Sequence, residues 1–266
     1  NDGLADSNAA MVTVTVEAAP QPAVTLYFST LGGWASNPVP GVAGPYDDAD
    51  IYSSDTAGAY GRLIDANVDL GLPGNADIDG LHVVDADTFY VSFNRDAGTT
   101  VPGLGVVQDE DVVLYDAGTW TMYFQGSTCG LNASNGRDID AISIEGGTLY
   151  FSTVAGGSGG SVVGVPSPWD DADVYTWAQG ATSCGRALDA SAVSLPGNAD
   201  VDGLTVKGGT YYMSFNRDAG TNVPGGVGVV QDEAVVSFDG VNWALYFSGP
   251  GLDTSNGQDL DAVHVP

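Results

Sequence analysis

Hydrophobic and polar residues alternate along this chain in short runs that predict strands and almost no helix. Apolar and aromatic runs of strand length are separated by clusters of Gly, Asn, Asp and Pro, and no window shows the 3.6-residue period of an amphipathic helix. Clear examples are Thr88–Phe93, Thr148–Thr153 and Thr210–Phe215. The pattern therefore predicts an all-β chain of many short strands.

A fourfold internal repeat organises these strands. Asn75–Leu81 (Asn-Ala-Asp-Ile-Asp-Gly-Leu) recurs as Asn198–Leu204, and related Asp-x-Asp motifs begin at Asp138 and Asp259. The first aspartates of successive motifs are 61, 62 and 59 residues apart. Each complete copy continues with an aromatic strand, a Gly/Pro-rich loop and an acidic start to a third strand. A fourth strand is clear only in copies one and three, so the repeat has an A-B-A-B character.

The two ends of the repeat region complete each other. The fourth copy ends after one strand at Pro266, whereas Leu26–Thr30 and Asp48–Tyr52 match the later strands of the second copy. Pairing of the last strand with the first part of the chain would close a ring and remove the open sheet edges. We therefore predict a four-bladed β-propeller over residues 23–266, with about 60 residues per blade, closed by its C-terminal strand.

Two resemblances concern the origin of the chain. Residues 1–22 include the alternating stretch Met11–Val16 and resemble the last strand of cadherin-like or Ig-like tandem modules. The remainder resembles an Asp-rich repeat of exported bacterial proteins, built on Asp-Ile-Asp-Ala, Leu-Tyr-Phe-Ser-Thr and Asp-Glu-Asp-Val units. The resemblance implies a module of a longer protein outside the cell or on the bacterial surface. If residues 1–22 are not part of such a tandem module, the alternatives are a disordered leader, or a strand that extends a sheet edge in its own molecule or in a neighbour.

The composition narrows the range of partners. The chain has 34 acidic and 6 basic residues, a net charge of −28, and 43% hydrophobic residues. This charge excludes nucleic acid as a natural partner, and the apolar content excludes a disordered acidic tail. No apolar run reaches the length of a membrane span. Thirty of the acids are Asp and four are Glu, which favours turns and oxygen coordination of hard cations. A saline habitat is a second explanation for the charge.

Strand alternation places the acidic loops of all four copies at one end of the propeller. Two carboxylates about 5 Å apart repel by about 3 kcal/mol at an effective dielectric constant of about 20. The arginines in or beside these loops are too few to balance them: Arg62, Arg95, Arg137, Arg186 and Arg217. With all-oxygen ligands, only two histidines and no thiolate cluster, we predict calcium rather than zinc.

The predicted calcium ligands are the aspartates of the repeated motifs and of the acidic loops. They are Asp48, Asp50, Asp77, Asp79, Asp109, Asp111, Asp138, Asp140, Asp171, Asp173, Asp200, Asp202, Asp232, Asp259 and Asp261. The motifs are not EF-hands, because Ala86 and Gly209 stand where the bidentate Glu would be. The alternative is that these aspartates cap turns without a metal. We expect His82 to have a packing role.

Cysteines and loop aromatics supply the other candidate residues. We predict a disulfide between Cys129 and Cys184, the alternative being two separate buried thiols. Trp34, Tyr46 and Trp169 lie in long loops at the acidic end and are predicted to bind a ligand such as a sugar, the alternative being loop packing.

The sequence thus favours a secreted calcium-binding β-propeller that serves as a binding or adhesion module. Its partner would be a glycan or a protein on a cell surface or matrix. One alternative is a structural assembly unit that self-associates through residues 1–22. The other is a glycan-active hydrolase or lyase, which we favour less because no carboxyl group stands out as an acid in an apolar pocket.

Overall fold

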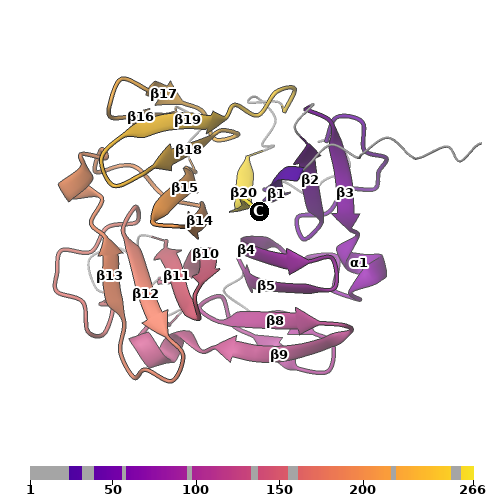
Figure 1. Cartoon of the computed structure of the whole chain (residues 1–266). Coiled ribbons are helices and arrows are strands. Elements are labelled where there is room, and N and C mark those ends of the chain that lie inside the picture. The colour runs from indigo at the N-terminus through magenta and orange to yellow at the C-terminus, as the bar shows by residue number, and fades with distance from the viewer. Residues whose placement is uncertain are drawn as a thin grey trace, which may run out of the picture.

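Four antiparallel sheets of four strands surround a central axis (Figure 1). The computed structural model describes residues 24–31, 39–55, 58–94, 98–132, 137–154, 161–216, 220–252 and 259–266. The predicted four-bladed β-propeller is therefore confirmed. The predicted segment 1–22 lies outside the described residues, so its assignment to a separate module stays a prediction.

Each blade begins with its innermost strand and proceeds outward. Blade 1 consists of β4 (Ile78–Asp85), β5 (Thr88–Phe93), β8 (Val112–Asp116) and β9 (Thr119–Phe124). Blade 2 consists of β10 (Ile139–Glu145), β11 (Thr148–Thr153), β12 (Val174–Ala178) and β13 (Gly185–Leu188). Blade 3 consists of β14 (Gly203–Lys207), β15 (Thr210–Ser214), β18 (Val235–Phe238) and β19 (Trp243–Phe247). Blade 4 consists of β20 (Leu260–His264), β1 (Val24–Thr30), β2 (Ile51–Asp55) and β3 (Tyr60–Ile64).

The ring closes as the repeat predicts. In blade 4 the C-terminal strand β20 pairs with β1, with Phe28 opposite Val263 and Ser29 opposite Ala262. Strands from the two ends of the described chain thus form one sheet, which leaves no open blade at the junction.

The loops after the second strands differ from the sequence prediction in blades 1 and 3. Each Gly/Pro-rich loop there forms a small hairpin, namely β6 (Thr99–Val101) with β7 (Gly105–Val107), and β16 (Thr221–Val223) with β17 (Gly228–Val230). Val101 and Val223 are buried, so the hairpins fold back onto their blades. The runs of only three residues per strand were too short to be recognised from the sequence.

Helical structure is confined to single turns in the described residues. These are α1 (Ala66–Asp69), η1 (Gly126–Cys129) and η3 (Ser191–Val193). Each follows the last strand of its blade, where the chain turns back toward the axis to begin the next blade. No helix of the described part is long and apolar enough to cross a membrane.

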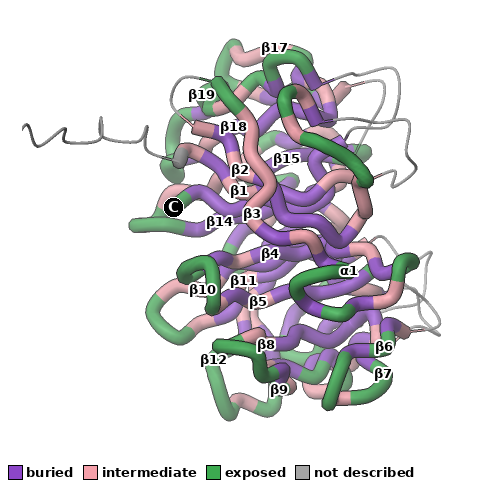
Figure 2. The backbone as a smooth tube through the Cα atoms, turned by 90° about the vertical axis from the view of Figure 1, so that its right-hand side faces the viewer, coloured by how far each residue is buried: buried purple, intermediate pink, exposed green. Residues whose placement is uncertain are grey.

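The hydrophobic core is divided into four clusters, one between each pair of neighbouring blades. Figure 2 shows the buried backbone concentrated in the interior and the exposed residues in peripheral turns. Trp120 and Trp243, on equivalent outer strands, are buried in two of these clusters. Neighbouring blades therefore pack against each other through apolar side chains, and the polar side chains lie in the loops and around the axis.

Candidate metal centre

The innermost strands gather the repeated motifs at one end of the axis. We call the eight aspartates of these motifs the aspartate ring. They are Asp77, Asp79, Asp138, Asp140, Asp200, Asp202, Asp259 and Asp261. The second aspartate of each motif, on β4, β10, β14 or β20 or at the start of such a strand, is between 1% and 4% exposed. Burial raises the pKa of Asp261 well above its ordinary value, and the charges of Asp79, Asp140 and Asp202 raise it further. The four second aspartates therefore face one another across the axis.

The first aspartate of each motif lies beside the second aspartate of the preceding blade. The carboxyl groups of Asp77 and Asp261 are within hydrogen-bonding reach, and so are those of Asp200 and Asp140. Burial and the charge of Asp48 raise the pKa of Asp77 to about 7, and burial raises that of Asp200 to about 6. Such pairs hold one proton or one cation between two carboxylates.

A further aspartate joins the ring at each seam between blades. We call Asp48, Asp109, Asp171 and Asp232 the seam aspartates. In every case the backbone carbonyl of the seam aspartate accepts a hydrogen bond, at 3.2–3.3 Å, from the N–H between the two motif aspartates of the next blade. The donors are Ile78, Ile139, Val201 and Leu260. This repeated backbone link brings the third strand of one blade to the motif of the next, as strand alternation predicts.

Several buried carboxylate oxygens at this end accept no hydrogen bond from the described residues. They include both oxygens of Asp109 and Asp232 and single oxygens of Asp48, Asp77, Asp140, Asp200, Asp202 and Asp261. A buried polar group without a partner costs about 1–3 kcal/mol, and more when it is charged. The arrangement therefore calls for protons or cations at these oxygens.

Two of the three described arginines form ion pairs with carboxylates outside the aspartate ring, and the third, Arg137, is buried beside Asp138 and donates to the Thr153 hydroxyl at 3.2 Å. Arg62 forms ion pairs with Asp50 at 3.3 Å and Asp65 at 2.7 Å, and Arg186 forms equivalent pairs with Asp173 at 3.3 Å and Asp189 at 3.0 Å. Both guanidinium groups also donate to carbonyls of the loop before the third strand. Arg95 and Arg217 lie outside the described residues. The ion pairs of Arg62 and Arg186 therefore do not involve the aspartate ring.

Three of the predicted calcium ligands have contacts that favour a turn-stabilising role. Asp50 accepts hydrogen bonds from Ala66 N–H, Asp47 N–H and the Tyr52 hydroxyl, and Asp173 has the same contacts in blade 2. Asp111 accepts a hydrogen bond from Gly126 N–H at 3.0 Å. These carboxylates fasten the start of the third strand to the end of the fourth, so their oxygens have partners without a metal.

The loop aromatics that were predicted as ligand-binding residues pack within their own loops. The Tyr46 hydroxyl donates to the Val42 carbonyl at 2.8 Å, and Trp169 Nε1–H donates to the Val165 carbonyl at 3.1 Å. An arginine lies over each ring, Arg62 at 5.8 Å and Arg137 at 5.5 Å. These contacts favour the packing alternative. Trp34 lies outside the described residues.

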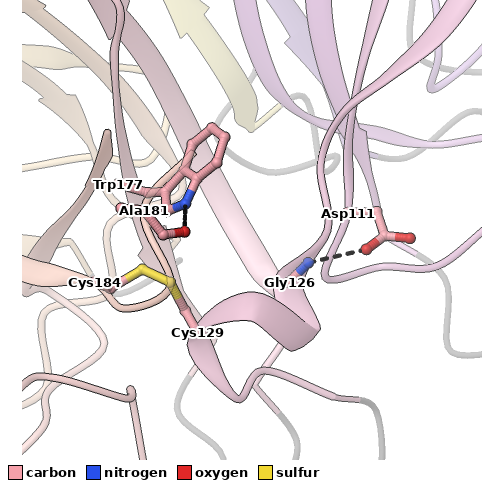
Figure 3. The surroundings of a disulfide bond; sticks show 6 residues. All are labelled: Asp111, Gly126, Cys129, Trp177, Ala181 and Cys184. Carbon is pink, nitrogen blue, oxygen red and sulfur yellow. Dashed lines mark hydrogen bonds between the residues drawn. A yellow bond between two sulfur atoms is a disulfide. The ribbon is translucent and has the colours of Figure 1, made fainter. Parts of the chain in front are cut away.

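The predicted disulfide is confirmed. Cys129 and Cys184 are bonded, with their Cα atoms 5.6 Å apart, and the bond ties η1 at the end of blade 1 to the loop before β13 in blade 2 (Figure 3). Figure 3 also shows Gly126 near the disulfide, with its N–H directed at Asp111.

No three His, Cys, Asp or Glu side chains of the described residues stand in a ready-made arrangement for a metal ion. The fit of the site to a cation therefore rests on the buried oxygens without partners and on the all-oxygen donor set. Two glutamates that the sequence analysis did not select, Glu110 and Glu233, also have buried oxygens at this end. Their position directly after a seam aspartate in only two of the four repeats was the signal that could have identified them.

The fold and the site together define an all-β propeller with four blades and a strongly acidic end. No protein-family model and no curated protein sequence matches the chain.

Comparison with solved structures returns weak similarities. One is to a chain in a crystal structure of a nidogen/laminin complex, with 11% identity and a TM-score of 0.36, covering 84% of this chain and 61% of the other. A second is to YCF48 from Cyanidioschyzon merolae, with 12% identity, a TM-score of 0.33 and coverages of 65% and 41%. A third is to YCF48 bound to D1 peptide, with 8% identity, a TM-score of 0.31 and coverages of 77% and 63%. The chain thus spans less than two thirds of each of these solved chains.

Proposed function

We propose that this chain is a calcium-binding β-propeller that serves as a binding or adhesion module of a larger extracellular protein. The observation that carries the proposal is the crowding of buried aspartates at one end of the axis, where both carboxylate oxygens of Asp109 and Asp232 accept no hydrogen bond from the described residues. Carboxylates in this number are stabilised together only by protons or by cations. Oxygen-only ligands favour calcium, which accepts six to eight oxygens in flexible geometry.

In this proposal calcium neutralises the aspartate ring and holds the four blades in one arrangement. Every ring aspartate lies beside an aspartate of a neighbouring blade, so an ion shared between them would resist separation of the blades. The long loops that surround the ring would then form a rigid contact surface for a glycan or a protein. The disulfide supports an extracellular location, because such bonds persist in oxidising compartments.

Thermal unfolding tests the calcium part of the proposal. The metal-free protein is prepared in EDTA and titrated with calcium at fixed ionic strength, with magnesium as the control ion. At a free calcium concentration 100 times Kd, each site adds about 2.7 kcal/mol to the free energy of unfolding. For a chain of this size that corresponds to a rise in Tm of roughly 5–10 °C per site. An equal response to magnesium, or none to calcium, would reject the proposal.

A further inference from the structure

The four repeats differ at one position that bears on where a cation binds. The residue after the seam aspartate is Glu110 in blade 1 and Glu233 in blade 3, but Ala49 in blade 4 and Ala172 in blade 2. Both alanines are fully buried, and both glutamates are only 8% exposed. Blades 1 and 3 therefore place an additional carboxyl group where blades 2 and 4 place a methyl group.

A second position changes together with the first. Gly126 and Gly249 follow the last strands of blades 1 and 3, and Ala66 and Ala190 occupy this position in blades 4 and 2. The four positions are equivalent because the carbonyl of each accepts a hydrogen bond, at 3.0–3.1 Å, from the N–H of a following leucine. These leucines are Leu131, Leu252, Leu72 and Leu195.

The two glycines pack directly against the glutamate residues. A Cβ atom at Gly126 would lie 2.3 Å from the Glu110 carbonyl oxygen and 2.5 Å from Glu110 Cγ, and a Cβ atom at Gly249 would lie 2.2 Å from Glu233 Cγ and 2.6 Å from the Glu233 carbonyl oxygen. An alanine at either position would therefore collide with both the backbone and the side chain of the glutamate. Glu is found with Gly in two blades and Ala with Ala in the other two, so the loop around the additional carboxyl group differs between the two kinds of blade.

These carboxyl groups meet others that are equally buried. Asp109 is 1% exposed, and neither of its carboxylate oxygens accepts a hydrogen bond from the described residues; the same holds for Asp232. One carboxylate oxygen of Glu110 and one of Glu233 are likewise buried and accept no hydrogen bond from the described residues. The Glu110 carboxyl is within hydrogen-bonding reach of Asp109, and the Glu233 carboxyl is within reach of Asp232. Burial and the adjacent aspartate raise the pKa of Glu110 to about 8 and that of Glu233 to about 7.

The next blade adds a third acidic residue to each pair. The N–H of Ile139 donates to the Asp109 carbonyl at 3.2 Å, which places the backbone of the preceding residue, Asp138, at the same seam. At the seam after blade 3 the N–H of Leu260 donates to the Asp232 carbonyl at 3.3 Å, and the charge of Asp259 acts on Glu233. Each cluster therefore joins two blades.

We infer that the chain holds two equivalent calcium ions, one at the seam after blade 1 and one at the seam after blade 3. The first is bound by Asp109, Glu110 and Asp138, and the second by Asp232, Glu233 and Asp259. This inference rests on the proposed function and adds to it the number of sites, their position and two ligands, Glu110 and Glu233. The seams after blades 2 and 4 lack the glutamate and do not form equivalent sites. Calcium is preferred to magnesium because mixed Asp and Glu oxygens on two blades do not impose a strict octahedron.

Calcium binding to the metal-free full chain, measured by isothermal titration calorimetry, tests this inference. We expect two tight sites per wild-type chain. Glu110→Gln and Glu233→Gln keep the side-chain volume, and each should abolish one site or weaken it by at least about tenfold. The double variant should lose both sites. The matched control is Glu145→Gln, which removes the same charge from the end of β10, outside the two seam clusters, and should leave two sites.

The results separate this inference from the proposed function. Four equivalent sites, or a single one, in the wild-type chain would overturn the inference without any variant. Unchanged binding in the folded double variant, with folding checked by circular dichroism, would overturn it while calcium-binding function stands. If the wild-type chain binds no calcium, the proposed function fails and the inference fails with it.

Discussion

At the residue scale, aspartates of the same acidic loops have different roles that depend on their position and neighbours. Asp50 and Asp173 are saturated by backbone amides, a tyrosine hydroxyl and an arginine, whereas Asp109 and Asp232 have no such donors around their carboxylates. A buried carboxylate with several donors is a structural element, and one without donors requires a proton or a cation. The donor count of each aspartate thus separates turn stabilisation from candidate ion binding.

The two histidines show that a titratable residue near the axis can be purely structural. His82 and His264 lie in edge-to-face contact, with ring centroids 4.6 Å apart, and line a cavity of about 200 Å³ with Thr205 and Lys207. The N–H of Ile144 donates to His82 Nδ1 at 3.2 Å, which requires the tautomer protonated at Nε2. The packing role expected for His82 agrees with these contacts.

We predict that both imidazoles stay neutral in the folded protein between pH 5 and 8. Burial lowers the pKa of His82 to about 4, and burial together with the neighbouring His82 and Lys207 lowers that of His264 to about 3. Because the unfolded chain takes up these protons near pH 6.5, the histidine contribution to stability is present above pH 6.5 and is lost as the pH falls. The loss is at most about 1.4 kcal/mol per pH unit for each histidine. Imidazole NMR titration checks this, and a midpoint near pH 6.5 would contradict it.

At the element scale, neighbouring blades are linked at related positions by different interactions, a disulfide in one half of the molecule and a hydrogen bond in the other. The disulfide Cys129–Cys184 joins blade 1 to blade 2. At the corresponding joint between blades 3 and 4, the Tyr60 hydroxyl donates to the Pro250 carbonyl at 2.9 Å. A covalent bond and a hydrogen bond thus occupy related positions in the two halves of the molecule.

We predict that replacing both cysteines by serine destabilises the protein far more than removing this hydrogen bond. The disulfide closes a loop with a sequence separation of 55 residues, and the loss of that constraint is worth up to about 4 kcal/mol. The matched variant Tyr60→Phe should cost about 1 kcal/mol or less. Urea unfolding of the three proteins measures both values. A double cysteine variant as stable as Tyr60→Phe would show that the disulfide adds nothing further to the free energy of unfolding.

At the scale of the whole molecule, stability depends on the closure of the ring. Strand β20 is the innermost strand of blade 4, and its Val263 lies in the hydrophobic cluster between blades 3 and 4. Without β20, blade 4 would lose its inner strand and the axis would open to water.

We predict that Val263→Asp opens the ring or prevents folding, because an unpaired charge in an apolar cluster costs several kcal/mol. The matched control is Val241→Asp, which places the same charge on a residue that is 81% exposed in the turn before β19. Limited proteolysis and thermal unfolding compare the two variants. Equal stability of both would contradict a closure role for β20.

The architecture was largely predictable because its determinants are local and repeated. The spacing of the Asp-x-Asp motifs, the matching of Leu26–Thr30 with Leu149–Thr153 and the alternation of strands all lie in the sequence. The hairpins β6–β7 and β16–β17 were not predicted, because strands of three residues have no detectable period and are stabilised by packing on the blade.

The sequence by itself determined the number of blades, their closure, the disulfide and the gathering of aspartates at one end. These follow from chain order and strand direction, which the repeat makes explicit. Only the tertiary structure decided which aspartates are saturated by amides and arginines and which are buried without donors. It also decided that Glu110 and Glu233 are buried, with Gly126 and Gly249 packed against them. Such differences arise from contacts between the start of the third strand and the end of the fourth strand of a blade, which the repeat spacing does not encode.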